Sequence, residues 1–384
     1  MELAKKFSQQ KPSGMVRVFR AIEEMQDVLN LSIGEPDFVT EPDIIDAAAK
    51  AAKEGFTHYT HLQGYLDVRE AACAYWERHH NFKANPDEVY ISVGGLQVPF
   101  LAFNVLLNPG DEVLLIEPYF TPYEAQIRSN GGVPVTVKTK SENNFTPTIE
   151  ELRAAATPKT RAIILNFPCN PTGRVPSLKQ LEEIAKFVEE RNLIVLSDEI
   201  YESMVFNSEG HHCFANIPGM KERTLLTSGV SKSHAMTGWR LGYVFAPKNV
   251  IDKMCVIASY QTYSANSVSQ KAAAYAMNTQ DEKVKSRAKI FHDRMDAVAK
   301  RLNAMKGVKC HDAEGAFYLF PDISGTGLTS EEFTWKLLNE AKVAVLPGSA
   351  FGESGEGYVR IACTQSMETL IKSMDAMQDF CGKL

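Results

Sequence analysis

Short apolar runs alternate with amphipathic segments through the middle of the chain. Strands are predicted where apolar and β-branched residues run together, at residues 89–93, 112–116, 133–137, 162–165 and 193–196. Helices are predicted between these strands, at residues 96–107 and 122–129 and from Ser177 onward. Strands and helices that alternate at this spacing form βαβ units with right-handed crossovers, so we expect an α/β fold with a mostly parallel sheet.

The helix after Ser177 has start and stop signals of its own. Ser177 and Gln180 have the spacing of a capping box, and the apolar residues 181, 184, 185 and 188 share one face. Asn192 is a suitable stop before the next strand.

The pattern changes after about residue 285. A long helix is predicted at residues 284–305, followed by apolar runs at 315–320, 343–346 and 358–362 and by a closing helix. We therefore expect a large domain over residues 45–285. The N-terminal residues 1–44 and residues 286–384 would form a smaller α+β domain.

Composition narrows the class of protein. The 384 residues carry a net charge of −6, which gives no bulk attraction to nucleic acid or to anionic lipid. The seven cysteines form no CxxC pair, which argues against a zinc site and for a reducing, cytoplasmic compartment. The N-terminus has no apolar signal core, and the longest uncharged stretch, residues 89–110, is interrupted by polar residues and fits a strand and a helix better than a membrane span.

Ligands of parallel sheets bind beyond the carboxyl ends of the strands, so the residues that follow each apolar run are candidates. Gly94 and Gly95 precede a helix start, where backbone N–H groups bind phosphate, although a plain turn also explains them. The motif Asn170-Pro171-Thr172-Gly173 either is a structural turn or directs a side-chain amide at the ring oxygen of a bound aromatic ligand. Asp198 fits a pyridinium partner or a helix N-cap, and Tyr201 fits a ring-oxygen contact or a core position.

The loop from Ser231 to Arg240 lies between two apolar runs, which places Lys232 at a strand end. A lysine beside a hydroxyl group, with an arginine eight positions on, suits a Schiff base to a phosphorylated aldehyde cofactor. A solvated surface lysine is the alternative.

Three further residues have both a functional and a structural interpretation. Arg360 in a strand can grip a carboxylate or form a surface ion pair. Gly34 can bring the backbone close to the same carboxylate or form a simple turn. Phe120 can stack on a flat ring or pack in the core.

Taken together and in this order, the motifs resemble those of class I aminotransferases of PLP fold type I. The resemblance covers almost the whole chain from about residue 13, and it rests on seven motifs: Gly34-Glu35-Pro36-Asp37, Tyr59 to Gly64, Gly94-Gly95, Asn170-Pro171-Thr172-Gly173, Ser197 to Tyr201, Lys232 to Arg240, and Arg360. It implies a seven-stranded, mostly parallel sheet flanked by helices in the large domain.

The resemblance also implies a role for each matching residue. Lys232 would bond to pyridoxal 5'-phosphate and shuttle the proton, and Asp198 would pair with the ring nitrogen. The ring oxygen would be bound by Tyr201 and Asn170, and Phe120 would stack on the ring. The phosphate would be held by Gly94, Gly95, the Leu96 N–H, Ser231, Arg240 and, from the neighbouring subunit of a homodimer, Tyr59. The substrate carboxylate would be bound by Arg360, Asn170 and the Gly34 backbone.

Three positions depart from the pattern. Leu96 stands where acid-specific members of the nearest subgroup carry a basic residue, and residues 259–270 lack the arginine of the better-known aspartate enzymes. Gly229 replaces a hydroxyl found in some members. We therefore expect ping-pong transfer from an aromatic or large apolar L-amino acid, and from aspartate as a further donor, to a 2-oxo acid such as 2-oxoglutarate.

Two alternatives stay open. Elimination from cysteine conjugates would use the same cofactor, and release of pyruvate and ammonia from cystathionine would identify it. A non-catalytic binding module of this fold would lose no function on Lys232→Ala, whereas the transamination hypothesis predicts a near-complete loss.

Overall fold

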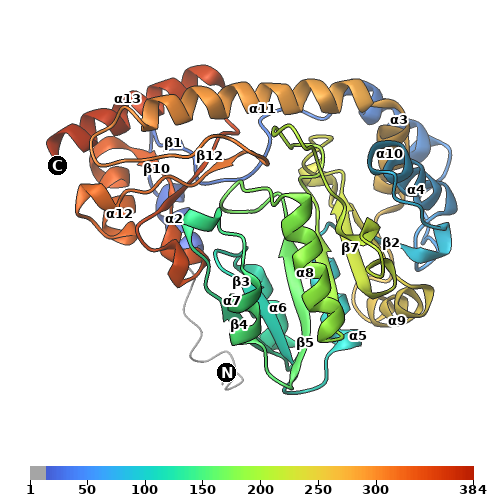
Figure 1. Cartoon of the computed structure of the whole chain (residues 1–384). Helices are drawn as coiled ribbons and strands as arrows, with labels where there is room; N and C mark the ends of the chain where they lie inside the picture. Colours follow the sequence, from blue (N-terminus) through green and yellow to red (C-terminus); the bar gives the residue numbers. More distant parts are fainter. Residues whose placement is uncertain (1–13) are drawn as a thin grey trace, which may run out of the picture.

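The computed structural model describes residues 14–384, so the first part of the predicted N-terminal arm lies outside the described residues. Its centre is a seven-stranded sheet (Figure 1). The order across the sheet is β2 (Val89–Ser92), β8 (Gly242–Phe245), β7 (Thr224–Gly229), β6 (Ile194–Asp198), β5 (Thr160–Asn166), β3 (Glu112–Ile116) and β4 (Val133–Val137). Only β8 runs antiparallel to its neighbours, so the expected mostly parallel sheet is confirmed.

Helices cover both faces of this sheet. One face packs against α5 (Gln97–Leu106), α6 (Pro122–Ser129) and α9 (Lys248–Ser259). The other face packs against α7 (Ile149–Ala155), α8 (Leu178–Glu190), α3 (Pro42–Lys53), α4 (Leu66–His80) and α10 (Ser267–Thr279). Neighbouring β3 residues show the alternation, because Leu114 belongs to one core and Val113 and Leu115 to the other.

The helix predicted after Ser177 is α8. The Ser177 hydroxyl accepts from the Gln180 N–H at 3.3 Å, and the Gln180 side chain accepts from the Ser177 N–H at 2.9 Å. The capping box is thus confirmed, and Leu181, Ile184, Ala185 and Val188 are buried as their shared face requires. Asn192 has a left-handed φ of 49° just beyond the helix.

The C-terminal part has its own sheets and helices. They are α11 (Asp281–Leu302), β9 (Tyr318–Leu319), α12 (Ser330–Ala341), β10 (Val343–Ala344), β11 (Leu346–Pro347), β12 (Val359–Ala362) and α13 (Met367–Lys383). From the N-terminal side, α2 (Gly14–Glu23) packs beside β11, and β1 (Leu29–Asn30) pairs with β10. Short 3-10 helices complete the chain: η1 (Pro86–Glu88), η2 (Ser141–Asn143), η3 (Phe214–Asn216), η4 (Lys221–Arg223), η5 (Thr237–Trp239), η6 (Ser324–Thr326), η7 (Gly348–Phe351) and η8 (Glu353–Gly355).

The apolar run at residues 343–346 forms two short strands rather than one element. Of these, β10 pairs in parallel with β1 and β11 pairs antiparallel with β12. The run at 315–320 likewise contributes only β9.

The long helix α11 joins the two parts of the molecule. Figure 1 shows it extending from the side of α3 and α10 to α13. The predicted domain limit at residue 285 falls inside this helix, and the division into domains stays a prediction.

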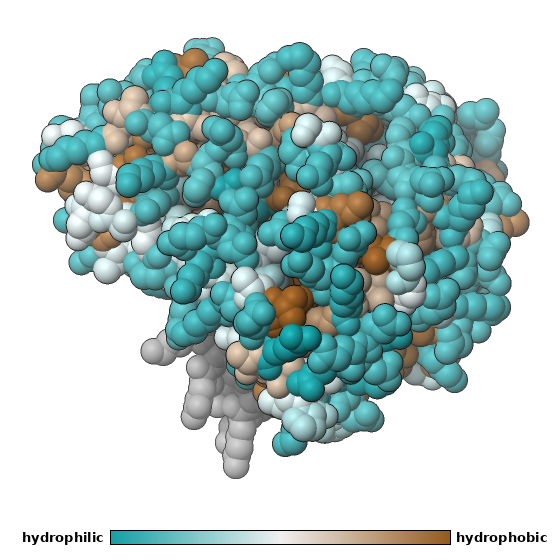
Figure 2. Space-filling view, in the orientation of Figure 1, coloured by the Kyte–Doolittle hydropathy of each residue, from teal (hydrophilic) through white to brown (hydrophobic). Residues whose placement is uncertain are grey.

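The molecular surface is ordinary in its polarity. No helix within residues 14–384 is long and apolar enough to cross a membrane. The face in Figure 2 is mainly hydrophilic, with hydrophobic residues in small separate groups.

Candidate active site

A cavity of about 440 Å³ lies at the carboxyl ends of the central strands. Asn166 ends β5, Asp198 ends β6, and Thr227 of β7 lies beside them on the wall. The predicted residues found on the wall are Gly34, Gly95, Leu96, Phe120, Asn170, Asp198, Tyr201, Ser231, Lys232, Arg240 and Arg360. The sheet topology thus brings together residues that are more than 300 positions apart in the chain.

Lys232 lies on the loop after β7, and its amine donates a hydrogen bond to the Gly34 carbonyl at 2.6 Å. Burial lowers its pKa to about 8, while the charge of Glu35 acts in the opposite direction and the charges of Arg360 and Arg240 add to the lowering. The surface-lysine alternative is therefore wrong, because the amine lies inside the cavity. An amine with this pKa is partly neutral near physiological pH and can act as a base or nucleophile.

Asp198 is the last residue of β6. Burial raises its pKa to about 6, although the Tyr123 hydroxyl donates to it at 2.5 Å and the Ile200 N–H at 3.2 Å. Asp198 is followed by a turn at residues 200–203 and not by a helix, so the N-cap alternative is wrong. No arginine, lysine or histidine among residues 14–384 forms an ion pair with it, and its charge is thus available to a cation in the cavity.

Tyr201 has the core position that one interpretation required, and its contact with a ring oxygen stays a prediction. Its side chain is 3% exposed and belongs to the C-terminal core, yet it also lines the cavity. Its hydroxyl lies 2.9 Å from the hydroxyl of Tyr318, a residue that the sequence motifs did not identify. Phe120 also combines two settings, because it packs against a core cluster and lines the cavity.

Arg360 occupies the centre of β12 and is 3% exposed. Its Nη1 donates to the Asn170 side chain at 2.9 Å, its Nη2 donates to the Ser32 carbonyl, and its Nε is buried without a partner. Across residues 14–384 no carboxylate pairs with it, so the surface-ion-pair alternative is wrong. A buried guanidinium with an unused donor is suited to an anionic ligand.

At two glycines of the site a larger residue would collide with neighbouring side chains. Gly94 has a left-handed φ of 74°, and a Cβ there would lie 2.5 Å from Nη2 of Arg240. A Cβ at Gly34 would overlap the Tyr318 hydroxyl. Gly95 has no comparable packing constraint, since the nearest atom would be 4.0 Å away. Gly94 and Arg240 are therefore in close contact, and Arg240 lines the cavity together with Arg360.

Tyr59 does not line the cavity of its own chain. Its side chain is 84% exposed, and its ring lies 4.9 Å from that of Tyr263. The structure therefore separates Tyr59 from the other predicted residues within one chain.

Further wall residues carried no motif signal. Tyr123 and Tyr318 contribute hydroxyl groups, and Met15 and Phe19 of α2 contribute apolar surface. Tyr123 lies three residues after Phe120, and Tyr318 lies in an apolar run, so their sequence positions suggested packing rather than chemistry.

The sheet order and this arrangement of a lysine, a carboxylate and two arginines define a fold type I aminotransferase. The family model described as aminotransferase class I and II matches residues 26–376, and the chain belongs to this family. It is an enzyme that transfers amino groups, which confirms the resemblance and sets the non-enzymatic alternative aside.

Individual relatives agree over nearly full length. An aspartate aminotransferase of Pyrococcus abyssi is 43% identical and covers 96% of this chain and 95% of its own length. Aromatic-amino-acid aminotransferase 2 of Thermococcus litoralis is 40% identical, with 98% of each chain covered. The crystal structure of an aromatic aminotransferase from Pyrococcus horikoshii has a TM-score of 0.91 at 41% identity and covers 95% of this chain and 99% of that one. The names of these relatives divide between two substrate classes.

Proposed function

We propose that this aminotransferase binds pyridoxal 5'-phosphate in the cavity and that Lys232 is the residue that bonds to it. The observation that carries the proposal is the pairing of a buried amine, with a pKa of about 8, and the carboxylate of Asp198, which has no cationic partner among residues 14–384. The cofactor contains an aldehyde for the first group and a ring nitrogen for the second. The residues present therefore fit the cofactor that the family implies.

The two ends of the cavity would bind two anions. At one end, Gly94, Gly95, the Leu96 N–H, Ser231 and Arg240 would hold the phosphate, because Gly94 lets the backbone approach the Arg240 guanidinium closely. At the other end, the substrate carboxylate would be bound by Arg360, Asn170 and the Gly34 backbone.

The groups between these ends would hold the ring. Tyr201 and Asn170 would bind its oxygen and Phe120 would stack on its face, since all three line the cavity. Asp198 would keep the ring nitrogen protonated.

When bound, pyridoxal phosphate supplies a carbonyl group that accepts the amine and a ring system that takes up electrons from the α-carbon. The substrate amine would displace Lys232 from the cofactor, and the freed Lys232 Nζ would remove the α-proton of the amino acid, because burial keeps part of this amine neutral. Lys232 would then return the proton at the carbon next to the ring. The amino group would pass to a 2-oxo acid in a second half-reaction, which is a ping-pong sequence.

The substrate side chain would meet an apolar wall. The apolar residues of the cavity wall include Met15, Phe19, Leu96, Pro99, Phe120 and Ile200. The cations on the described wall are Lys232, Arg240 and Arg360, and each has a role above. This lining supports aromatic or large apolar amino donors, with aspartate as a further donor and 2-oxoglutarate as an acceptor.

Two features support a homodimer. Tyr59 is exposed outside its own cavity, and Leu96 and Arg240 are exposed at the cavity wall. In the proposed dimer, Tyr59 reaches the phosphate site of the neighbouring subunit. The seven cysteines, all free, support a cytoplasmic location.

Borohydride reduction followed by peptide mass spectrometry tests the covalent bond. We expect a pyridoxyl group on Lys232 and none on Lys271, a control lysine held by Asp67 at 2.5 Å. An unmodified Lys232 in purified, cofactor-loaded protein would contradict the proposal.

A half-reaction screen tests the substrate class. Phenylalanine or tyrosine should change the cofactor absorbance faster than aspartate at equal concentration. A faster reaction with aspartate would contradict the proposed preference.

A further inference from the structure

A second polar cluster lies behind the candidate active site. Asp198 at the end of β6 and Tyr201 in the turn that follows line the cavity. Glu199 and Glu202 are each 2% exposed and make their contacts on the other side. Glu199 lies 2.6 Å from His211. Glu202 accepts a hydrogen bond from the Tyr75 hydroxyl at 2.9 Å. Residues that line the cavity thus alternate along this segment with residues that are hydrogen-bonded on the side away from the cavity.

Glu202 is a buried acid with a neutral donor. Burial raises its pKa to about 7, and the Tyr75 hydrogen bond and the charge of His211 act against this rise. The groups that face it come from three elements: Tyr75 of α4, Tyr243 of β8 and His211 of the loop that follows the turn. Within residues 14–384 its Oε2 has no hydrogen-bond partner, so the Tyr75 hydroxyl is the side-chain donor found there that fixes the orientation of this carboxyl group.

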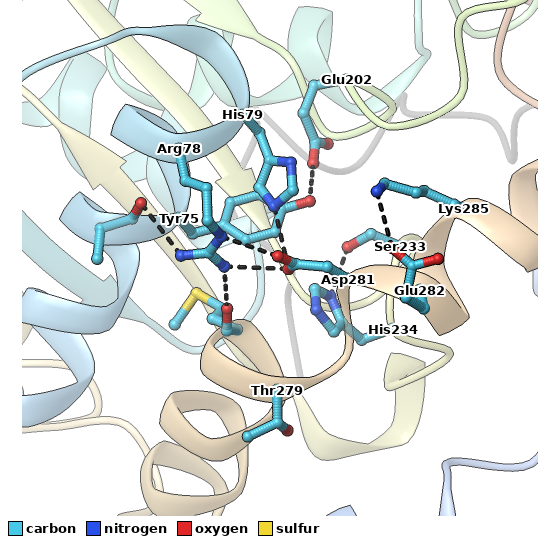
Figure 3. A network of polar contacts seen from close by, with 12 residues as sticks. Tyr75, Arg78, His79, Glu202, Ser233, His234, Thr279, Asp281, Glu282 and Lys285 are labelled. Atoms are coloured by element: carbon cyan, nitrogen blue, oxygen red, sulfur yellow. Dashed lines mark hydrogen bonds and ion pairs between the residues drawn. The ribbon is translucent and has the colours of Figure 1, made fainter.

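The ring of Tyr75 also supports the loop that carries Lys232. Its centroid lies 5.8 Å from that of His234, two residues beyond Lys232. The His234 ring is held in turn by the Ser233 hydroxyl at 2.7 Å. Figure 3 shows Tyr75 of α4 close to both Glu202 and the Ser233–His234 segment.

The position of Tyr75 is itself fixed by contacts with neighbouring side chains. Its ring packs against His79 one turn further along α4, at 4.5 Å between centroids, and His79 lies 3.0 Å from Asp281 at the start of α11. Arg287 of α11 donates to the Ser233 carbonyl at 3.2 Å, so α4 and α11 both contact this loop.

We propose that Tyr75 is a positioning residue, whose hydroxyl holds the turn that carries Tyr201 and whose ring holds the loop that carries Lys232. One side chain of α4 then sets the spacing of two groups on the cavity wall, Tyr201 and Lys232. Small displacements of reacting groups lower turnover strongly. This inference rests on the proposed function, in which Tyr201 contacts the ring oxygen and Lys232 moves the proton.

The test uses the pH dependence of the absorbance of the bound cofactor. A hydrogen bond to the ring oxygen favours its deprotonated form, so loss of that bond raises the apparent pKa of the chromophore. Tyr201→Phe removes the bond directly and should raise this pKa. Tyr75→Phe leaves Tyr201 in the chain but misplaces it, and should shift the pKa in the same direction by a smaller amount.

Tyr90→Phe is the matched control. Tyr90 is also fully buried, but its hydroxyl has no hydrogen-bond partner and it lies on β2 away from the cavity. This variant should titrate like the unmodified enzyme.

Glu202→Leu removes the acceptor of the Tyr75–Glu202 hydrogen bond, and it tests the positioning role if Tyr75→Phe does not fold. It should reproduce the shift of Tyr75→Phe. The conservative variant Glu202→Gln keeps an acceptor for the Tyr75 hydroxyl and should restore the titration of the unmodified enzyme.

Kinetics supply a second readout. Tyr75→Phe should lower kcat by about 10-fold while KM for the amino donor changes by less than about twofold, because Arg360 is not held by Tyr75.

The possible failures are distinguishable. If Tyr201→Phe shifts the titration and Tyr75→Phe behaves like Tyr90→Phe, the positioning role is wrong and the proposed function stands. If Tyr201→Phe leaves the titration unchanged, the proposed contact of Tyr201 is wrong and the positioning role falls with it.

Discussion

Burial, rather than ion pairing, sets the protonation of the residues in the cavity. The pKa of Lys232 is lowered to about 8 and that of Asp198 is raised to about 6, and burial is the main cause of both shifts. Between these two values Asp198 is mostly charged while a growing fraction of Lys232 is neutral. Below about pH 6 the carboxylate takes up a proton and the amine is fully charged, so both groups lose the forms that the proposed chemistry uses.

The first prediction concerns Glu35, an exposed residue on the cavity wall. Its negative charge favours the ammonium form of Lys232, so Glu35→Gln should lower the pKa of Lys232 further below 8. The measurement is an NMR titration of reductively methylated lysines in protein freed of cofactor. Glu340→Gln, at an exposed site on α12, is the control and should leave the Lys232 titration in place. A rise in the Lys232 pKa would show that Glu35 acts in another way.

A position just after an apolar run was enough to predict several of the residues that line the cavity. Asp198 and Lys232 follow apolar runs, and the sheet brings such positions to one edge. The alternatives for Arg360 could not be separated in this manner, because its burial depends on Tyr318 and on the distant Ser32 carbonyl. Tyr123 was missed for the same reason, since its contact with Asp198 spans 75 positions.

At the level of helices and strands, sequence patterns predicted those elements that are stabilised by interactions between residues close in the chain. The segments at 112–116, 122–129 and 133–137 have the predicted bounds, and the α8 capping box is present. Helices α4 and α10 were not predicted. They pack on each other around alanines and aromatic residues that are buried on several sides, so no single apolar stripe marks them. The apolar run at residues 343–346 did not indicate two strands, because their partners come from other parts of the chain.

The second prediction tests the start of α8. Ser177→Ala removes the hydroxyl that accepts from the Gln180 N–H, and it should lower the free energy of unfolding by about 1 kcal/mol. Urea denaturation at a fixed protein concentration measures this change. Ser286→Ala, at an exposed position within α11, is the control and should leave stability unchanged or slightly higher. Equal losses in both variants would exclude capping as the cause.

For the whole molecule, the order of the motifs was more informative than any one of them. Each motif has a common structural alternative, yet together they identified the family that the comparison shows. The relation of Tyr59 to the site depended on the resemblance alone, because this residue faces away from the cavity of its own chain.

The third prediction uses mixed dimers of Lys232→Ala and Tyr59→Phe subunits. The Lys232→Ala dimer should be almost inactive, and the Tyr59→Phe dimer should bind the cofactor more weakly. A mixed dimer contains one site with both Lys232 and Tyr59, so at limiting cofactor it should regain about half of the activity of the unmodified dimer. The measurement is the activity of purified, doubly tagged dimers.

A mixture of Lys232→Ala and unmodified subunits is the control for this experiment, and it should also retain about half of the activity if the Tyr59 residues are intact. A mixed dimer that remains as weak at limiting cofactor as the Tyr59→Phe dimer would place both residues in sites within single subunits.

The strict alternation at the end of β6 has a consequence for how this chain tolerates insertions and deletions. Asp198 and Glu199 are neighbouring acids that serve opposite sides of the sheet, one in the cavity and one beside His211. Loss of one residue from β6 would move Glu199 to the place of Asp198 and turn Asp198 to the side that now carries Ser197 and Glu199, so the longer acid would face the ligand. A deletion or insertion of a single residue in β6 should therefore disrupt the cavity, because it reverses the side on which each acid lies.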